Sequence, residues 1–198
     1  RMKKHPLLFS LFVIVIIVAV MSAAMLGIFY LASGTEGPFQ FGERIALLDL
    51  RGLLSDGSQP VSLLETYGKQ ENIKAVILRI DSPGGGVAPA QEIYREIQRV
   101  RQKKPVVAYM SNIAASGGYY IASAADKIVA SPGTLTGSIG VIMRFSNWEE
   151  LLKKLGVDIV VIKAGQFKDI GSPNRKMTKE EQDLLDQVVM DVHDQFIR

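Results

Sequence analysis

The stretch Asn112-Ile113-Ala114-Ala115-Ser116-Gly117-Gly118-Tyr119-Tyr120 predicts the centre of this fold. An apolar run at residues 106–110 precedes it and is typical of a buried strand, while small residues at 121–125 favour a helix. Ser116 therefore falls at a strand-to-helix junction. Such a junction lifts a hydroxyl clear of the sheet, next to the unpaired N–H groups and the positive dipole end of the helix. The stretch alone allows two interpretations, a nucleophile or a simple helix cap.

Strands and helices alternate on both sides of this junction. Apolar runs predict strands, and segments with apolar residues on one helical face predict helices. The predicted strands are residues 44–50, 75–80, 106–110, 127–130, 140–143 and 157–163; the predicted helices are residues 61–69, 88–102, 121–125, 148–155 and 179–197. Thr178 and Glu181 form the pattern of a capping box at the start of the last helix. This alternation indicates an α/β fold with a mainly parallel sheet and right-handed crossovers.

The segment from Leu7 to Leu31 contains no charged residue. An apolar helix of about 20–25 residues is long enough to cross a bilayer. A cleavable signal peptide has a shorter apolar core and a small-residue cleavage site. Because Ala32-Ser33-Gly34 could serve as such a site, a signal peptide remains an alternative to the transmembrane anchor that the length favours.

The charges that flank this segment predict its orientation. Arg1, Lys3 and Lys4 precede it, while Glu36 and Glu43 follow it. Positively charged flanks remain in the cytoplasm, so the N-terminus is expected inside and the rest of the chain outside the cytoplasmic membrane.

The composition excludes several classes of chemistry. The 198 residues include no cysteine, so the chain has no disulfide, no thiolate nucleophile and no cysteine-ligated metal. The net charge is only +3, and no basic stripe with interleaved aromatic residues is present, which gives nucleic-acid binding little support. The run Gly84-Gly85-Gly86 has neither the spacing of a dinucleotide fingerprint nor the lysine of a phosphate loop, and we expect no metal and no cofactor.

In a parallel sheet, ligands bind beyond the carboxyl ends of the strands. Four loops are predicted at that edge, at residues 81–87, 111–116, 131–140 and 164–175. The glycine run in the first loop is by itself no more than a flexible turn. Beside a nucleophile, however, its N–H groups could approach a substrate closely and bind the oxyanion formed in acyl transfer.

A serine nucleophile needs a base, and histidine is a poor candidate in this chain. His5 lies on the predicted cytoplasmic side of the membrane segment. His193 lies deep in the last predicted helix between Asp191 and Asp194, where we interpret it as structural or solvated.

Lysine is therefore the expected base. A lysine ammonium has an ordinary pKa near 10.4, and burial lowers that pKa by disfavouring the charged form. Lys168 lies between Phe167 and Ile170 in a loop otherwise rich in small residues, which suits such burial. The pattern does not separate it from the other lysines nearby, Lys163, Lys176 and Lys179.

Taken together, the motifs resemble those of the signal peptide peptidase A family, membrane-anchored Ser–Lys proteases of the ClpP/crotonase-like fold. The matching segments are Ile80–Gly85, Asn112–Tyr120, Leu135–Val141 and Gly165–Asp169, and they occur in the family's order. The resemblance covers about Ile45 to the end of the sequence, together with the N-terminal anchor.

The resemblance implies a role for each site residue. Ser116 would be the nucleophile and Lys168 the general base, with Ser138 hydrogen-bonding the lysine amine. The oxyanion hole would be formed by the backbone of Gly84 and Gly85 with the N–H of Gly117. On this basis the chain is expected to have a cytoplasmic N-terminus at 1–6, an anchor at 7–31, a linker at 32–43 and a protease domain at 44–198 whose C-terminal part is absent from the sequence.

The resemblance also implies a short family form that assembles into a ring-like homo-oligomer in which neighbours complete each site. The expected substrates are membrane-proximal peptides, namely signal-peptide remnants or membrane-protein fragments. Three alternatives remain open: a crotonase-like acyl-CoA enzyme, a non-catalytic membrane scaffold, and a protease that acts on stomatin-like partners.

Overall fold

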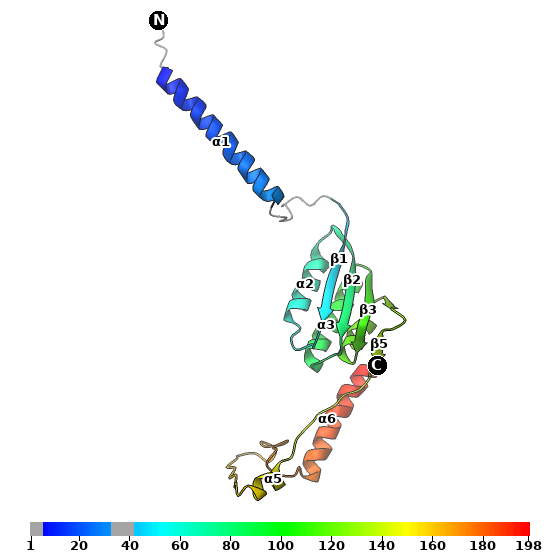
Figure 1. Ribbon diagram of the computed structural model, residues 1–198. Helices are drawn as coiled ribbons and strands as arrows, with labels where there is room; N and C mark the ends of the chain where they lie inside the picture. Colours follow the sequence, from blue (N-terminus) through cyan, green and yellow to red (C-terminus); the bar gives the residue numbers. More distant parts are fainter. Residues whose placement is uncertain (1–5, 33–41) are drawn as a thin grey trace. The chain divides into compact units, whose positions relative to one another are not determined.

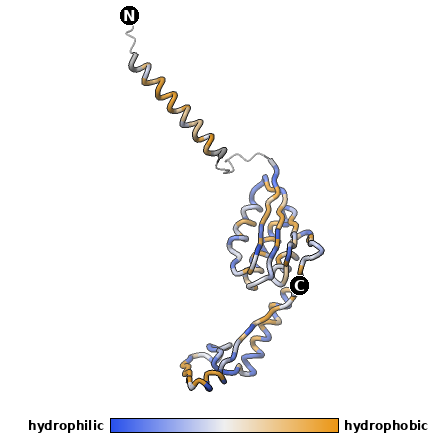
Figure 2. Tube along the Cα trace, in the orientation of Figure 1, coloured by the Kyte–Doolittle hydropathy of each residue, from blue (hydrophilic) through white to orange (hydrophobic). Residues whose placement is uncertain are grey.

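The computed structural model describes residues 6–32 and 42–198, which belong to two compact units that divide after Gly42 (Figure 1). The described part of the first unit is helix α1 (Pro6–Ala32). Its segment Phe9–Phe29 is long and apolar enough to cross a membrane, and none of it is buried. Figure 2 shows hydrophobic residues along this helix, whereas a soluble helix normally confines them to one stripe. The predicted cytoplasmic segment and linker lie almost wholly outside the described residues.

The second unit is a parallel α/β domain built from successive strand–helix repeats. Its elements are β1 (Arg44–Arg51), α2 (Ser58–Lys69), β2 (Ile73–Ser82), α3 (Val87–Arg101), β3 (Val106–Ala115), α4 (Gly117–Ser123), β4 (Lys127–Ala130) and β5 (Leu135–Gly137). The strand order is β1-β2-β3-β4, and every pairing is parallel. The mainly parallel α/β sheet predicted from the sequence is therefore confirmed.

Besides β2, the strand β3 pairs with two further strands, each along a different part of its length. Its first half, from Val107 to Met110, pairs with β4, while Ile113–Ala115 pairs with β5. The sheet therefore extends farther at the carboxyl end of β3 than the sequence predicted, and β3 ends directly before Ser116.

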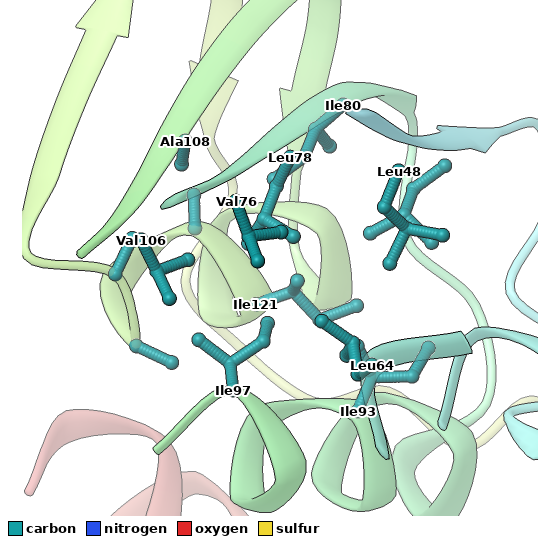
Figure 3. Close-up of a cluster of buried hydrophobic side chains, with 14 of the residues drawn as sticks. Leu48, Leu64, Val76, Leu78, Ile80, Ile93, Ile97, Val106, Ala108 and Ile121 are labelled. Atoms are coloured by element: carbon teal, nitrogen blue, oxygen red, sulfur yellow. The ribbon is translucent and has the colours of Figure 1, made fainter. Parts of the chain in front are cut away.

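The hydrophobic core lies between the sheet and helices α2, α3 and α4. Alternate residues of β2 are buried because successive side chains of a strand point to opposite faces. Figure 3 shows these side chains meeting the buried side chains of the helices. The labelled strand residues Leu48, Val76, Leu78, Ile80, Val106 and Ala108 and the helix residues Leu64, Ile93, Ile97 and Ile121 are all buried.

After β5 the chain leaves the sheet and returns to it through a long helix. We call residues 141–178 the arm; they include the short helix α5 (Glu149–Lys154), and helix α6 (Lys179–Ile197) follows them. Figure 1 shows the arm reaching away from the sheet and α6 leading back. The predicted capping box is confirmed: the Glu181 N–H donates to Thr178 Oγ1 at 3.2 Å, and the Thr178 N–H donates to Glu181 Oε2 at 2.9 Å.

Two predicted strands are wrong. Residues 140–143 and 157–163 have no regular secondary structure. Their β-branched residues favour a strand, but the chain between residues 42 and 198 offers neither segment a strand to pair with. Composition alone therefore misled the prediction, because a strand needs a hydrogen-bonding neighbour as well as a suitable sequence.

Adjacent leucines of β1 test the assignment of the core. Leu48 is 3% exposed and faces the helices, whereas Leu47 is 53% exposed. We expect Leu48→Ala to lower the free energy of unfolding by about 2–5 kcal/mol, since it leaves a cavity in the core. Leu47→Ala, the matched control, should cost much less. Urea denaturation followed by circular dichroism measures both, and equal losses would contradict this assignment.

Candidate active site

Ser116 is held in a strained backbone conformation between β3 and α4. Its φ of 51° and ψ of −123° are rare for a residue with a side chain. Its N–H donates to the Gly137 carbonyl at 2.8 Å, and its carbonyl accepts from the Tyr120 N–H at 2.9 Å. Strain of this kind persists only where the surrounding structure enforces it, and it is common at catalytic residues. Nucleophile elbows place their serine on a similarly sharp strand-to-helix turn.

The carboxylate of Asp81 holds the end of β3 in place. The pairing register of β2 and β3 shifts between Ile80 and Ser82. At this point Asp81 accepts hydrogen bonds from Asn112 Nδ2 at 3.0 Å and from the Ile113 N–H at 3.3 Å. These two hydrogen bonds connect β2 to β3 at the register shift, directly before the part of β3 that pairs with β5 and ends at Ser116.

The glycine-rich loop packs directly against the junction. A Cβ atom at Gly84 would lie 2.7 Å from Gly117 N and 2.9 Å from Ser116 Cβ, so the position has no room for a side chain. A Cβ atom at Gly85 would lie 2.4 Å from the Leu54 carbonyl oxygen. Leu54 fixes the loop further, because its N–H donates to the Gly84 carbonyl and its carbonyl accepts from the Gly86 N–H.

The three glycines of the predicted oxyanion hole differ in the state of their N–H groups. The N–H of Gly84 donates to Ser82 Oγ at 3.1 Å. The N–H groups of Gly85 and Gly117 have no acceptor in the domain as described, and Gly117 begins α4, where helix N–H groups lack intrahelical partners. Gly85 and Gly117 are thus the two available donors, while Gly84 contributes close packing against Ser116.

Ser82 is a supporting residue that the sequence analysis did not identify. It is fully buried, and its hydroxyl donates to the Gly52 carbonyl at 2.6 Å while it accepts from the Gly84 N–H. The hydroxyl therefore ties the glycine-rich loop to the end of β1. Its position at the end of a buried strand, directly before Pro-Gly-Gly, is the sequence signal that could have suggested this role.

An apolar pocket opens beside Ser116. It is lined by the glycine-rich loop, by apolar residues of α3 and α4, by the start of the arm and by the end of α6, with Val87, Ala90, Tyr120, Ile142, Val192 and Phe196 among its residues. Tyr120 stacks on Tyr94 with ring centroids 4.3 Å apart and meets the edge of Phe196 at 5.1 Å. His193 is not among the lining residues.

Lys168 lies in the arm, on the turn between Gly165 and Ser172. The backbone of this turn is closed by hydrogen bonds from the Lys168 N–H to the Gly165 carbonyl and from the Ser172 N–H to the Asp169 carbonyl. The side chain is exposed, so the burial expected from Phe167 and Ile170 does not occur within one chain. Its amine has no hydrogen-bond or ion-pair partner among residues 42–198.

Two of the alternative lysines are engaged elsewhere. The Lys163 amine pairs with Asp169 and donates to the Gln166 carbonyl, and the Lys179 amine pairs with Asp183 at 2.5 Å. Lys176 shows no such side-chain pair, although its backbone N–H donates to Glu149. Of the four candidate lysines, Lys168 and Lys176 are therefore the two whose amines make no hydrogen bond or ion pair in the described domain.

A single chain keeps Ser116 and Lys168 apart. Asp169, next to Lys168, is linked through Arg175 to Glu181 in the first turn of α6, whereas Phe196 in the last turn lines the pocket with Ser116. A helix rises 1.5 Å per residue, so the span from Glu181 to Phe196 is about 22 Å, more than a lysine side chain can bridge.

Ser138 lies on the side of the nucleophile. It follows Gly137, whose carbonyl binds the Ser116 N–H, and it is exposed with a φ of 53°. The structure thus brings Ser116, Ser138 and the three glycines together and leaves Lys168 on the arm. No group of three His, Asp or Glu residues suited to a metal ion occurs within residues 6–32 and 42–198.

Replacement of Ser82 tests its support of the loop. Ser82→Ala leaves the Gly84 N–H and the Gly52 carbonyl without a buried partner, so we expect a loss of about 1–3 kcal/mol in the free energy of unfolding. Amide hydrogen exchange at Gly84 should become faster. Ser62→Ala, at an exposed serine of α2, is the control and should change stability by less than about 0.5 kcal/mol. Unchanged protection of the Gly84 amide would contradict the role of Ser82.

Acid should loosen the contact between the arm and α6. The guanidinium of Arg175 lowers the pKa of Glu181 from 4.5 to about 2, and it also lowers the pKa of Asp169. A lowered pKa in the folded state stabilises the fold at a pH above the unfolded value, and this stability is lost as the pH falls through the folded value. Protection of the first-turn amides of α6 should therefore fall between about pH 4.5 and pH 2. Constant protection over this range would contradict the prediction.

Comparison with known proteins shows the family to which the chain is similar. The family model for peptidase family S49 matches residues 98–198, and the model for Clp protease matches residues 56–134. A Synechocystis protein provisionally named a protease is 43% identical over 81% of this chain and 59% of its own length. The chloroplastic serine protease SPPA of Arabidopsis thaliana is 37% identical over 70% of this chain and 20% of its own length.

A further relative and a solved structure are also similar to parts of this chain. A Methanocaldococcus jannaschii protein, also provisionally named a protease, is 40% identical over 72% of this chain and 46% of its own length. A solved structure of the 1510-N membrane-bound stomatin-specific protease is 26% identical over 55% of this chain and 53% of that chain, with a TM-score of 0.46. The chain spans about half the length of the first curated relatives it matches. With the S49 model matching half of its residues, the chain belongs to peptidase family S49.

Proposed function

We propose that this chain is the catalytic part of a membrane-anchored serine endopeptidase that uses a Ser–Lys dyad. The observation that carries the proposal is the strained Ser116, whose neighbours Gly85 and Gly117 present two unpaired N–H groups beside an apolar pocket. Acyl transfer needs this combination, since it requires an exposed nucleophile and preorganised donors for the oxyanion.

In the proposed mechanism the Ser116 hydroxyl attacks the carbonyl carbon of a peptide bond. Neutral Lys168 takes the hydroxyl proton, and the N–H groups of Gly85 and Gly117 hold the negative oxygen that forms. The lysine then gives the proton to the leaving amine, which departs and leaves an acyl ester on Ser116. Water, deprotonated by the same lysine, attacks the acyl carbon, and the lysine returns the proton to the Ser116 oxygen as the acid product leaves. Ser138, beside the nucleophile, orients the amine by a hydrogen bond.

Lys168 reaches Ser116 from a second copy of the chain. This part of the proposal is supported by the separation of the two residues within one chain and by the exposed apolar side chains of the arm. Leu155, Val160 and Ile162 are 66%, 85% and 96% exposed, respectively. The run at 157–163 also has the composition of a strand that lacks a neighbour. A ring-like homo-oligomer would cover these groups and exclude water from the amine.

The substrates are membrane-proximal peptides, such as signal-peptide remnants or fragments of membrane proteins. The apolar pocket beside Ser116 suits such segments, and α1 would hold the enzyme at the membrane where they are produced. In the proposed topology residues 1–6 are cytoplasmic, 7–31 span the cytoplasmic membrane, 32–43 form a linker and the protease domain at 44–198 is extracytoplasmic.

Mixing two inactive variants tests both residues and the source of the lysine. Ser116→Ala and Lys168→Ala should each lower peptide hydrolysis by about 10³-fold or more. When the two variants are co-expressed in equal amounts, about a quarter of the sites combine an intact serine with an intact lysine from the neighbour, and activity should return to about that level. Lys176→Ala, the matched control on the arm, should keep full activity.

The outcomes separate the parts of the proposal. Full activity of either single variant would remove that residue from the mechanism. Two inactive variants that remain inactive when co-purified in one assembly would contradict a dyad shared between copies.

A further inference from the structure

The carboxylate next to Lys168 is occupied by two other cations. Asp169 accepts hydrogen bonds from Arg175 Nε at 2.9 Å and from Arg175 Nη2 at 2.8 Å, and it also pairs with the Lys163 amine. Its side chain is only 16% exposed. A planar guanidinium that binds both oxygens of a carboxylate fixes its orientation more firmly than a single contact does.

The opposite edge of Arg175 binds Glu181. Arg175 Nη1 donates to Glu181 Oε2 at 2.8 Å, and the Glu181 side chain is 4% exposed. Glu181 is already fixed by the capping box of α6. Arg175 therefore connects the turn that carries Lys168 to the capped first turn of α6.

Two other acidic side chains, Glu149 in the arm and Glu180 at the start of α6, are either bound by other groups or exposed. Glu149 accepts from Lys153 Nζ at 2.7 Å and from the Lys176 N–H. Glu180 is exposed on the hollow that Lys163, Arg175, Lys176 and Glu181 also line. Although Asp169 follows it directly in the chain, Lys168 makes no ion pair with any group in the described domain.

This arrangement has a consequence for a lysine that acts as a base. An opposite charge within reach favours the charged form of an amine, whereas a general base must release its proton near the operating pH. The Asp169 carboxylate, which follows Lys168 in the chain, is bound by Arg175 and Lys163 instead of by the Lys168 amine.

We propose that Arg175 is a positioning residue for Lys168, which acts by holding Asp169 away from the amine and by fixing the turn on the first turn of α6. The proposal rests on the proposed function, in which Lys168 is the general base. It assigns a role in peptide hydrolysis to a residue that touches neither Ser116 nor the pocket.

The test measures pH–rate profiles for the full chain in detergent-solubilised membranes. In Arg175→Gln the Asp169 carboxylate keeps only Lys163 as a cation and can reach the Lys168 amine, so the midpoint of the acidic limb of kcat/KM should move to higher pH and kcat near neutral pH should fall about tenfold or more, with KM little changed. Adding Asp169→Asn to this variant should return the limb to its original position, because no carboxylate remains to pair.

Two further variants distinguish a change around the Lys168 amine from a simple loss of folding. Lys163→Met removes the other cation from Asp169 but leaves the two-oxygen contact with Arg175 in place, so it should move the limb less than Arg175→Gln does. Arg175→Lys keeps the charge but cannot bind both oxygens, so it should move the limb by an intermediate amount. A purely structural role for Arg175 would lower activity at every pH without moving the limb. Circular dichroism melting curves establish which variants are folded.

Three results would overturn the proposal. The first is an unmoved limb in folded Arg175→Gln, and the second is a shift that Asp169→Asn does not reverse. In either case an inactive Lys168→Ala would leave the proposed function intact. The third is full activity of Lys168→Ala, which would remove the base itself and overturn both proposals together.

Discussion

The close approach of two backbone segments sets the geometry of this site. Gly84 lies so near Ser116 and Gly117 that a single methyl group would collide with the backbone of the junction. This contact packs the glycine-rich loop, which carries Gly85, against the junction that carries Ser116 and Gly117. The surrounding groups serve to maintain it: Ser82 and Leu54 hold the loop, Asp81 holds the end of β3, and the Gly137 carbonyl holds the strained serine.

Much of the sheet domain could be predicted from the sequence, because its signals are local. The apolar runs of β1 to β4, the helical spacing of α3 and the capping box of α6 each depend on residues close together in the chain. The role of Ser82 could not be predicted in this way, since it depends on hydrogen bonds to Gly84 and Gly52. The separate states of the Gly84 and Gly85 N–H groups likewise appear only when all acceptors are known.

The arm shows where sequence reasoning fails. The run at 157–163 was expected to be a strand whose carboxyl end would bring Lys168 to the same sheet edge as Ser116. No such strand forms in the described chain, and Lys168 lies instead on a turn fixed to the start of α6. A hydrophobic pattern reports that a segment favours a covered, extended conformation, but it does not report whether the covering partner belongs to the same chain. On the proposed mechanism, the sheet domain supplies the nucleophile and the arm of a neighbour supplies the base, so hydrolysis depends on assembly.

The most direct test of the central claim, that Ser116 is an activated nucleophile, is covalent labelling at the membrane. The full-length protein in native membranes is treated with a serine-reactive fluorophosphonate, digested, and analysed by mass spectrometry to locate the modified residue. The account predicts one modified serine, Ser116. Modification of a different residue, or a protein that hydrolyses peptides while Ser116 stays unlabelled, would contradict it.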